Sequence, residues 1–161
     1  MKRVAANDPV ALSEFGVSLF HDENYDGAFK YWTQAAELGD VEAHYNVSIA
    51  YQEGAGVEND EEKEVYHLEE AAIGGHPSAR YKLARYECEK HRFDRTAKHL
   101  IIAANLGHDE SIQMLKEFYK HGLVSKEDFA MALRGHQAAV DATKSPQREE
   151  AAKFYAKHQF W

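Results

Sequence analysis

The 161-residue chain contains one cysteine, Cys88, and three prolines. A single cysteine cannot form an intramolecular disulfide or supply a cysteine-rich metal cage, which fits a reducing compartment. No apolar run approaches the roughly 18 residues of a membrane span, and no hydrophobic signal core follows Met1. We therefore expect a soluble chain without a membrane partner. The compartment stays unknown, with a reducing, intracellular (cytoplasmic) one favoured.

Positive charge is also scarce, since 19 Lys and Arg face 27 Asp and Glu, which leaves a net charge of −8. A phosphate backbone would meet the wrong sign over most of the surface, so we expect no nucleic-acid partner. Length and composition match one ordinary soluble domain, and abundant Ala, Glu, Lys and Leu favour helix. The sequence therefore predicts a single all-α domain over residues 1–161.

A motif of two alanines followed by a glycine recurs three times, at residues 35–39, 71–75 and 103–107. Its glycines are Gly39, Gly75 and Gly107, so the intervals between copies are 36 and 32 residues. Periods of this size are typical of repeats built from a pair of helices. A glycine at this point favours the left-handed conformation that ends a helix. The pattern predicts stacked helix pairs.

Apolar residues recur at helical spacing on both sides of each motif. Val47, Leu83 and Leu115 are expected to be buried in the first helices of their pairs. The predicted helices are about 9–21, 25–38, 41–53, 60–73, 77–90, 93–106, 109–121, 126–143 and 146–158. They form four repeats, at about 8–39, 41–75, 77–107 and 109–143, with Ser145-Pro146 starting a separate C-terminal helix.

The segment Gly54-Ala55-Gly56-Val57-Glu58-Asn59-Asp60 resembles the G-x-G-V-x-x-D signature of the Sel-1-like repeat family. The third copy has Glu89–Arg92 in place of this loop and is similar there to the related tetratricopeptide repeat. The resemblance implies a right-handed superhelix (solenoid) of antiparallel helix pairs that acts as an adaptor for protein partners. It implies no shared catalytic residue and no cofactor. Residues 144–161 match neither repeat.

Ten histidines raise the question of a metal site. His67 with His99, and His76 with His108, are one 32-residue period apart and could stack in neighbouring repeats. A zinc or copper site needs three or four converging ligands, usually including a local pair, and no His-x-x-x-His or Cys-x-x-Cys occurs. We expect no metal, with His76 and His108, which follow helix-stopping glycines, in loops or at helix starts. A histidine-based metal-binding protein or small enzyme stays an alternative.

Other catalytic patterns are weak. Cys88 has glutamates on both sides, which disfavours a thiolate nucleophile. Gly54-Ala55-Gly56 is not followed by the Gly-Lys-Ser/Thr ending that a phosphate loop requires. We expect no catalytic residue, and hence a protein that is not an enzyme.

In stacked helix pairs the first helices line the concave side. Residues two before, two after and five after Val47, Leu83 and Leu115 lie on a neighbouring stripe of the helix surface, which core packing does not need. Tyrosine and arginine often dominate interface energies, so Tyr45, Tyr81 and Arg85 are the chosen anchors. The alternative is that both tyrosines pack inside their own repeats. The predicted partner-binding residues are Tyr45, Ile49, Gln52, Tyr81, Arg85, Gln113 and Glu117.

The C-terminal segment is locally basic and ends in aromatic residues, including Phe154, Tyr155 and Trp161. An amphipathic helix here would cover the open end of the last repeat, or would join two copies as a homodimer. The sequence as a whole predicts a noncatalytic adaptor or scaffold that binds a peptide or helix in its concave groove. A self-associating structural protein, built through the C-terminal aromatic helix, is the alternative.

Overall fold

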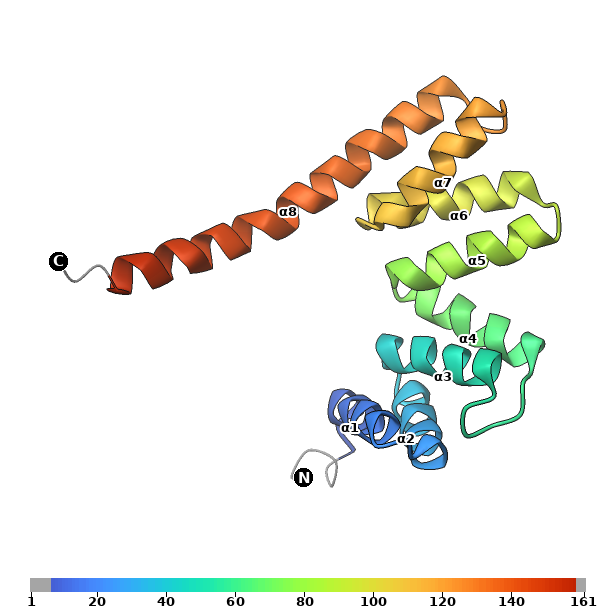
Figure 1. Ribbon diagram of the computed structural model, residues 1–161, viewed down its shortest axis with the longest axis vertical. Helices are drawn as coiled ribbons and strands as arrows, with labels where there is room; N and C mark the ends of the chain where they lie inside the picture. The colour runs from blue at the N-terminus through green and yellow to red at the C-terminus, as the bar shows by residue number, and fades with distance from the viewer. Residues whose placement is uncertain (1–6, 159–161) are drawn as a thin grey trace. The chain divides into compact units, whose positions relative to one another are not determined.

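The computed structural model describes residues 7–158, apart from the side chains of 145–148, 151, 152 and 154–158. The described residues form helices and no strand (Figure 1), which confirms the predicted all-α fold. The first seven helices begin and end within one residue of their predicted bounds. The helices are α1 (Pro9–His21), α2 (Tyr25–Glu37), α3 (Val41–Glu53), α4 (Glu61–Ile73), α5 (Pro77–Glu89), α6 (Phe93–Asn105), α7 (Asp109–Lys120) and α8 (Lys126–His158).

The chain divides into two compact units, and the boundary lies inside α5, between Leu83 and Ala84. We call these parts unit 1 and unit 2. We call α1, α3, α5 and α7 the A helices, because each is the first helix of its pair, and α2, α4, α6 and α8 the B helices. Short turns connect most successive helices, and a longer loop connects α3 to α4 (Figure 1).

The alanine and glycine motif ends α2, α4 and α6 in the same way. Gly39, Gly75 and Gly107 all have φ of 88°, the left-handed conformation that glycine adopts without strain. The N–H of Gly39 donates to the carbonyl of Ala36 (2.8 Å), and the N–H of the next residue donates to the carbonyl of Ala35 (3.0 Å). The same two bonds close α4 and α6. The predicted helix stops are therefore confirmed as Schellman motifs.

The loop between α3 and α4 uses its signature residues for distinct purposes. Gly54 and Gly56 both have φ of 71°. A Cβ atom on Gly56 would lie 2.3 Å from the backbone oxygen of Tyr25, so only glycine fits there. Val57 packs against the buried cluster around Trp32. The Asp60 carboxylate accepts a hydrogen bond from the N–H of Lys63 (3.1 Å) and caps α4.

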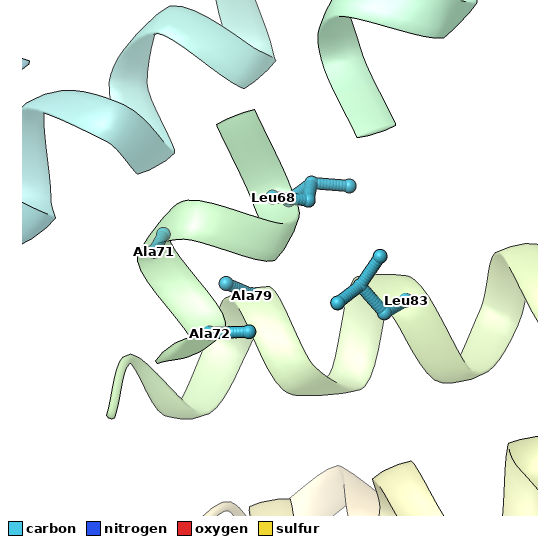
Figure 2. Packing of buried hydrophobic residues seen from close by; sticks show 5 residues of the cluster. All are labelled: Leu68, Ala71, Ala72, Ala79 and Leu83. Atoms are coloured by element: carbon cyan, nitrogen blue, oxygen red, sulfur yellow. The ribbon is translucent and has the colours of Figure 1, made fainter. Parts of the chain in front are cut away.

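The core of unit 1 alternates large residues with alanines. Figure 2 shows Leu68, Ala71 and Ala72 of α4 packed against Ala79 and Leu83 of α5, all of them buried. The alanines let the helix backbones approach closely, while the leucines fill the space between them. The same packing of a large residue against a small one occurs in the first helix pair.

Between α1 and α2, the indole of Trp32 lies directly over Gly16. A Cβ atom on Gly16 would lie 2.6 Å from the ring, and the indole N–H donates to the carbonyl of Ser13 (3.2 Å). A large buried side chain thus requires a residue without a side chain opposite it. This contact and the hydrogen bond hold α1 against α2.

Unit 2 has its own core around Leu100 and Leu115, which are fully buried. Its α5–α6 turn has no glycine, and His91 supplies the left-handed conformation with φ of 57°. Glu87 is 4% exposed and forms ion pairs with Arg92 and with Arg95 (3.3 Å to Nη2). The charge cluster therefore closes this hairpin.

The C-terminal region differs from the prediction. Separate helices over 126–143 and 146–158 were expected, but α8 is one helix of 33 residues, so the break at Ser145-Pro146 is wrong. Proline removes one intrahelical N–H, yet its φ near −65° is helical, and the surrounding alanines, lysines and glutamates are good helix formers. The predicted start of α8 is confirmed, because the hydroxyl of Ser125 accepts from the N–H of Asp128 (3.0 Å).

The aromatic side chains of the C-terminal segment, and residues 159–161 as a whole, lie outside the described residues. Capping of the last repeat and dimerisation through this segment therefore stay predictions.

Candidate functional site

Two surfaces of unit 1 carry the groups of chemical interest, and the first is the predicted stripe on the A helices. Tyr45 of α3 is half-buried and packs against the cluster that contains Leu68 and Leu83. Its ring stacks on the imidazole of His76, with centroids 4.2 Å apart and planes at 20°. Burial raises the pKa of Tyr45 above its usual value. Its phenol ring thus serves packing as well as surface.

The neighbouring predicted residues connect α3 to α5. The ammonium group of Lys82 donates to the side-chain oxygen of Gln52, and it also lies 5.8 Å from the centroid of the Tyr45 ring. Ile49 and Tyr81 are partly exposed on α3 and α5. The structure therefore brings Tyr45 and Gln52 together through one lysine that the sequence analysis did not name.

The other predicted binding residues belong to unit 2. Arg85, Gln113 and Glu117 are all exposed, the first on α5 and the others on α7. Lys120 donates to the Glu117 carboxylate (2.7 Å) and holds the pKa of that carboxyl below its usual value. These side chains are available to a partner, and their role as binding residues stays a prediction.

Two of the histidines act at helix starts. The N–H of Ala79 donates to Nδ1 of His76 (3.2 Å), so the proton of a neutral ring lies on Nε2. That atom lies 3.1 Å from the Glu42 carboxylate and donates to it. His108 is the N-cap residue of α7, and its Nδ1 lies 3.1 Å from the hydroxyl of Ser111.

The second surface is a cleft of about 520 Å³ between the two B helices of unit 1, α2 and α4, with α3 beside them. None of its lining residues belongs to the predicted stripe. Ala36 and Gly39 supply its apolar part. The polar and aromatic side chains that line it are Thr33, Glu37, His44, Tyr66, His67 and Glu70.

A histidine pair lies in this cleft. Nδ1 of His44 and Nδ1 of His67 are 2.9 Å apart, a hydrogen-bond distance that requires a proton on one atom and a lone pair on the other. Burial, with a smaller contribution from His44, lowers the pKa of His67 to about 4. His67 is therefore neutral at neutral pH. Rings of Tyr51 (5.9 Å, stacked) and Tyr66 (5.0 Å, edge-on) flank it.

The histidine pair is not a metal centre of the usual kind. Within the described part of the chain, no three or more His, Cys, Asp or Glu side chains are placed to hold a metal ion. Spacing along the chain does not predict this pair, because its members are 23 residues apart, which is not a repeat period. One signal for the pair was present. His44 follows Ala43 and His67 precedes Leu68, and both of these neighbours are core residues of the same hairpin.

Comparisons with known proteins find the repeat in the sequence. The Sel1 repeat family model matches residues 11–40 and 41–76. Protein SHC1 of Saccharomyces cerevisiae is 30% identical over 141 residues, which cover 78% of this chain and 28% of that protein. The chitin synthase regulator SKT5 of the same yeast is 42% identical over 59 residues, or 37% of this chain and 8% of that protein. The chain thus spans less than a third of the length of these relatives.

Solved structures share the fold. A Sel1 repeat protein from Oxalobacter formigenes superposes with a TM-score of 0.73 at 22% identity, over 88% of this chain and 61% of that one. Antigen c5321 of uropathogenic Escherichia coli, described as displaying an SLR fold, gives a TM-score of 0.67 at 18% identity, over 87% and 31%. The predicted helical-repeat fold class is therefore confirmed. None of the described helices combines the length and hydropathy of a membrane span.

Proposed function

We propose that this chain, which is a Sel1-like repeat protein, acts as a noncatalytic adaptor or scaffold that binds a peptide or helix of a partner on its A-helix face. Sel1 repeat proteins generally mediate protein–protein interactions, and the family is generally noncatalytic. The proposal narrows this general role to one face of the repeat. It also assigns the chain to the cytoplasm.

One observation carries the proposal. The residues that define the repeat are buried in the core, whereas the adjacent stripe on the A helices lies wholly or partly at the surface. Val47, Leu83 and Leu115 are at most 3% exposed. The stripe beside them contributes one patch in each unit. The proposed contacts are Tyr45, Ile49, Gln52 and Tyr81 in unit 1, and Arg85, Gln113 and Glu117 in unit 2.

The name of one relative supports an action through contact rather than chemistry. SKT5 is named as a regulator of chitin synthase. We extend this mode of action to the present chain: it binds a partner protein and thereby changes the activity or the location of that partner. The identity of the partner is a separate question, because the shared segment is short.

Charge reversal on the A-helix face tests the proposal better than removal of Tyr45, whose ring packs against the core. Arg85→Glu changes an exposed side chain on α5, and Lys98→Glu makes the same reversal at an exposed position on the B helix α6. Partners captured by the wild type are purified, and their Kd is measured by calorimetry. We expect at least a tenfold weaker Kd for Arg85→Glu and little change for Lys98→Glu. Equal effects of the two variants contradict the proposed face.

Self-association is the competing explanation of a repeat protein with an aromatic C-terminal segment. Light scattering over a concentration series separates the two. A mass of one chain at all concentrations excludes the homodimer, whereas a dimer that dissociates after removal of residues 146–161 supports it.

A further inference from the structure

The cleft between α2 and α4 has a distinct charge pattern. Glu37 and Glu70 line it from opposite helices, and no lysine or arginine lines it. Neither carboxylate forms an ion pair with any residue in the described part of the chain. The chain as a whole has a net charge of −8. An anionic ligand would therefore be repelled, and a cationic one attracted.

Two imidazoles that share a hydrogen bond also line the cleft. Because His44 and His67 share one hydrogen bond through their Nδ1 atoms, neutral rings leave opposite states at the two Nε2 atoms. The ring that donates through Nδ1 has a lone pair at Nε2, and the other ring has a proton there. In that neutral state the pair offers one acceptor and one donor, with no charge that would repel a cation.

The wall of the cleft includes a flat aromatic face. Tyr66 is 54% exposed as a residue, and its ring forms a T-shaped pair with the ring of His67, with centroids 5.0 Å apart. Guanidinium groups stack on such faces, and their planar N–H groups match carboxylates in a two-point geometry. A lysine ammonium satisfies the charge but not the planar stacking.

From this combination of carboxylates, a neutral acceptor and an exposed ring around one cleft, we infer that the cleft binds the guanidinium group of an arginine in an extended segment of a partner protein. The inference rests on the proposed function, since it supplies one side-chain preference of the partner. It concerns a surface between B helices, distinct from the A-helix stripe. A partner that uses both surfaces would contact two sides of unit 1.

The test titrates the full chain with single-residue probes and follows backbone amide shifts by NMR. N-acetyl-arginine amide is the probe, N-acetyl-citrulline amide is its uncharged isostere, and N-acetyl-lysine amide supplies charge without the planar group. We expect saturable shifts at residues 37, 44, 66, 67 and 70 with arginine, at least fivefold weaker binding with lysine, and none with citrulline. Equal shifts from citrulline, lysine binding as tight as arginine, or shifts confined to other residues overturn the inference.

Glu70→Gln supplies the matched variant, because it removes charge from the cleft and keeps the shape of the side chain. Its neighbour Glu69 is exposed on α4 and does not line the cleft. We expect at least fivefold weaker arginine binding for Glu70→Gln and no change for Glu69→Gln. Equal binding by the two variants overturns the inference. Failure here leaves the adaptor proposal intact if Arg85→Glu still weakens partner binding, so the two outcomes are distinguishable.

Discussion

The α3–α4 and α5–α6 hairpins are closed by different physics. The first connection spans residues 54–60 and depends on backbone conformation, with glycines at positive φ and one backbone contact too close for a side chain. The second spans residues 90–92 and depends on the buried Glu87 with its two arginines. The stability of the first connection should therefore depend on side-chain volume at its glycines, whereas that of the second should depend on salt concentration.

The shorter connection is also the one that recurs at the start of the chain. The α1–α2 turn has the same length as the α5–α6 turn, and Glu23 has φ of 58° where His91 has 57°. A three-residue turn thus accepts a non-glycine residue in the left-handed conformation where its side chain is exposed, as those of Glu23 and His91 are. The longer loop lies against Tyr25 and cannot do the same.

The largest expected effect is that of Gly56→Ala. The new Cβ would meet the backbone oxygen of Tyr25 at 2.3 Å, and the residue would keep φ of 71°. We expect a loss of about 2–4 kcal/mol in the free energy of unfolding, measured by urea titration. In Gly122→Ala, φ is 69° but no atom lies within 4 Å of the new Cβ. That control should lose only about 1 kcal/mol, and equal losses would mean that contact with Tyr25 is unimportant.

The next effect is a loss of stability in acid that arises from His67 in the α3–α4 hairpin. The pKa of His67 is about 4 in the fold, against 6.5 for a free histidine, so the unfolded chain binds more protons between these values. Stability should be full above pH 6.5 and fall by about 2–3 kcal/mol as the pH approaches 4. Urea titrations at pH 7.0 and 4.5 should show a smaller acid loss for His67→Phe than for the wild type.

A histidine outside the cleft provides the comparison. His121 is exposed after α7, so His121→Gln should retain the acid loss of the wild type. If His67→Phe and the wild type lose stability in parallel, the buried imidazole is not the cause.

Glu87→Gln should have an intermediate effect that depends on salt. The variant keeps the side-chain shape and removes the charge that faces Arg92 and Arg95, whose side chains are 43% and 58% exposed and therefore hydrate readily. We expect a loss of about 1–2 kcal/mol at low ionic strength and a smaller loss in 1 M salt. Glu89→Gln, at an exposed position of the same helix, should change little. A loss for Glu87→Gln that ignores salt would indicate packing rather than charge.

The smallest effects concern the first turns of two A helices. The Asp40 carboxylate accepts from the N–H of Ala43 (2.7 Å), whereas His108 makes no side-chain capping bond to the backbone of α7. Asp40→Ala should lose about 1 kcal/mol, and His108→Ala only a few tenths, in thermal unfolding. A larger loss for His108→Ala would show that its contact with Ser111 matters more than a backbone cap.

Much of the fold follows from local sequence. Helix spacing, capping residues and the alanine–alanine–glycine stops involve hydrogen bonds and contacts within a few positions, so their outcome is readable from a short window. Residues 35–39 illustrate this, since the alanines that pack between helices also accept the bonds of the Schellman motif. The predicted helix break at Ser145-Pro146 also rested on local sequence, and it was wrong because strong helix formers on both sides outweigh the effect of one proline.

The sequence by itself therefore determined the repeat, the bounds of its first seven helices and the glycine stops of α2, α4 and α6, because these depend on periodicity and local backbone chemistry. Only the tertiary structure decided that Tyr45 stacks on His76, that His44 meets His67, and that two glutamates border a cleft between B helices. Those contacts depend on how neighbouring helices cross and which rotamers fit between them. No spacing along the chain specifies either.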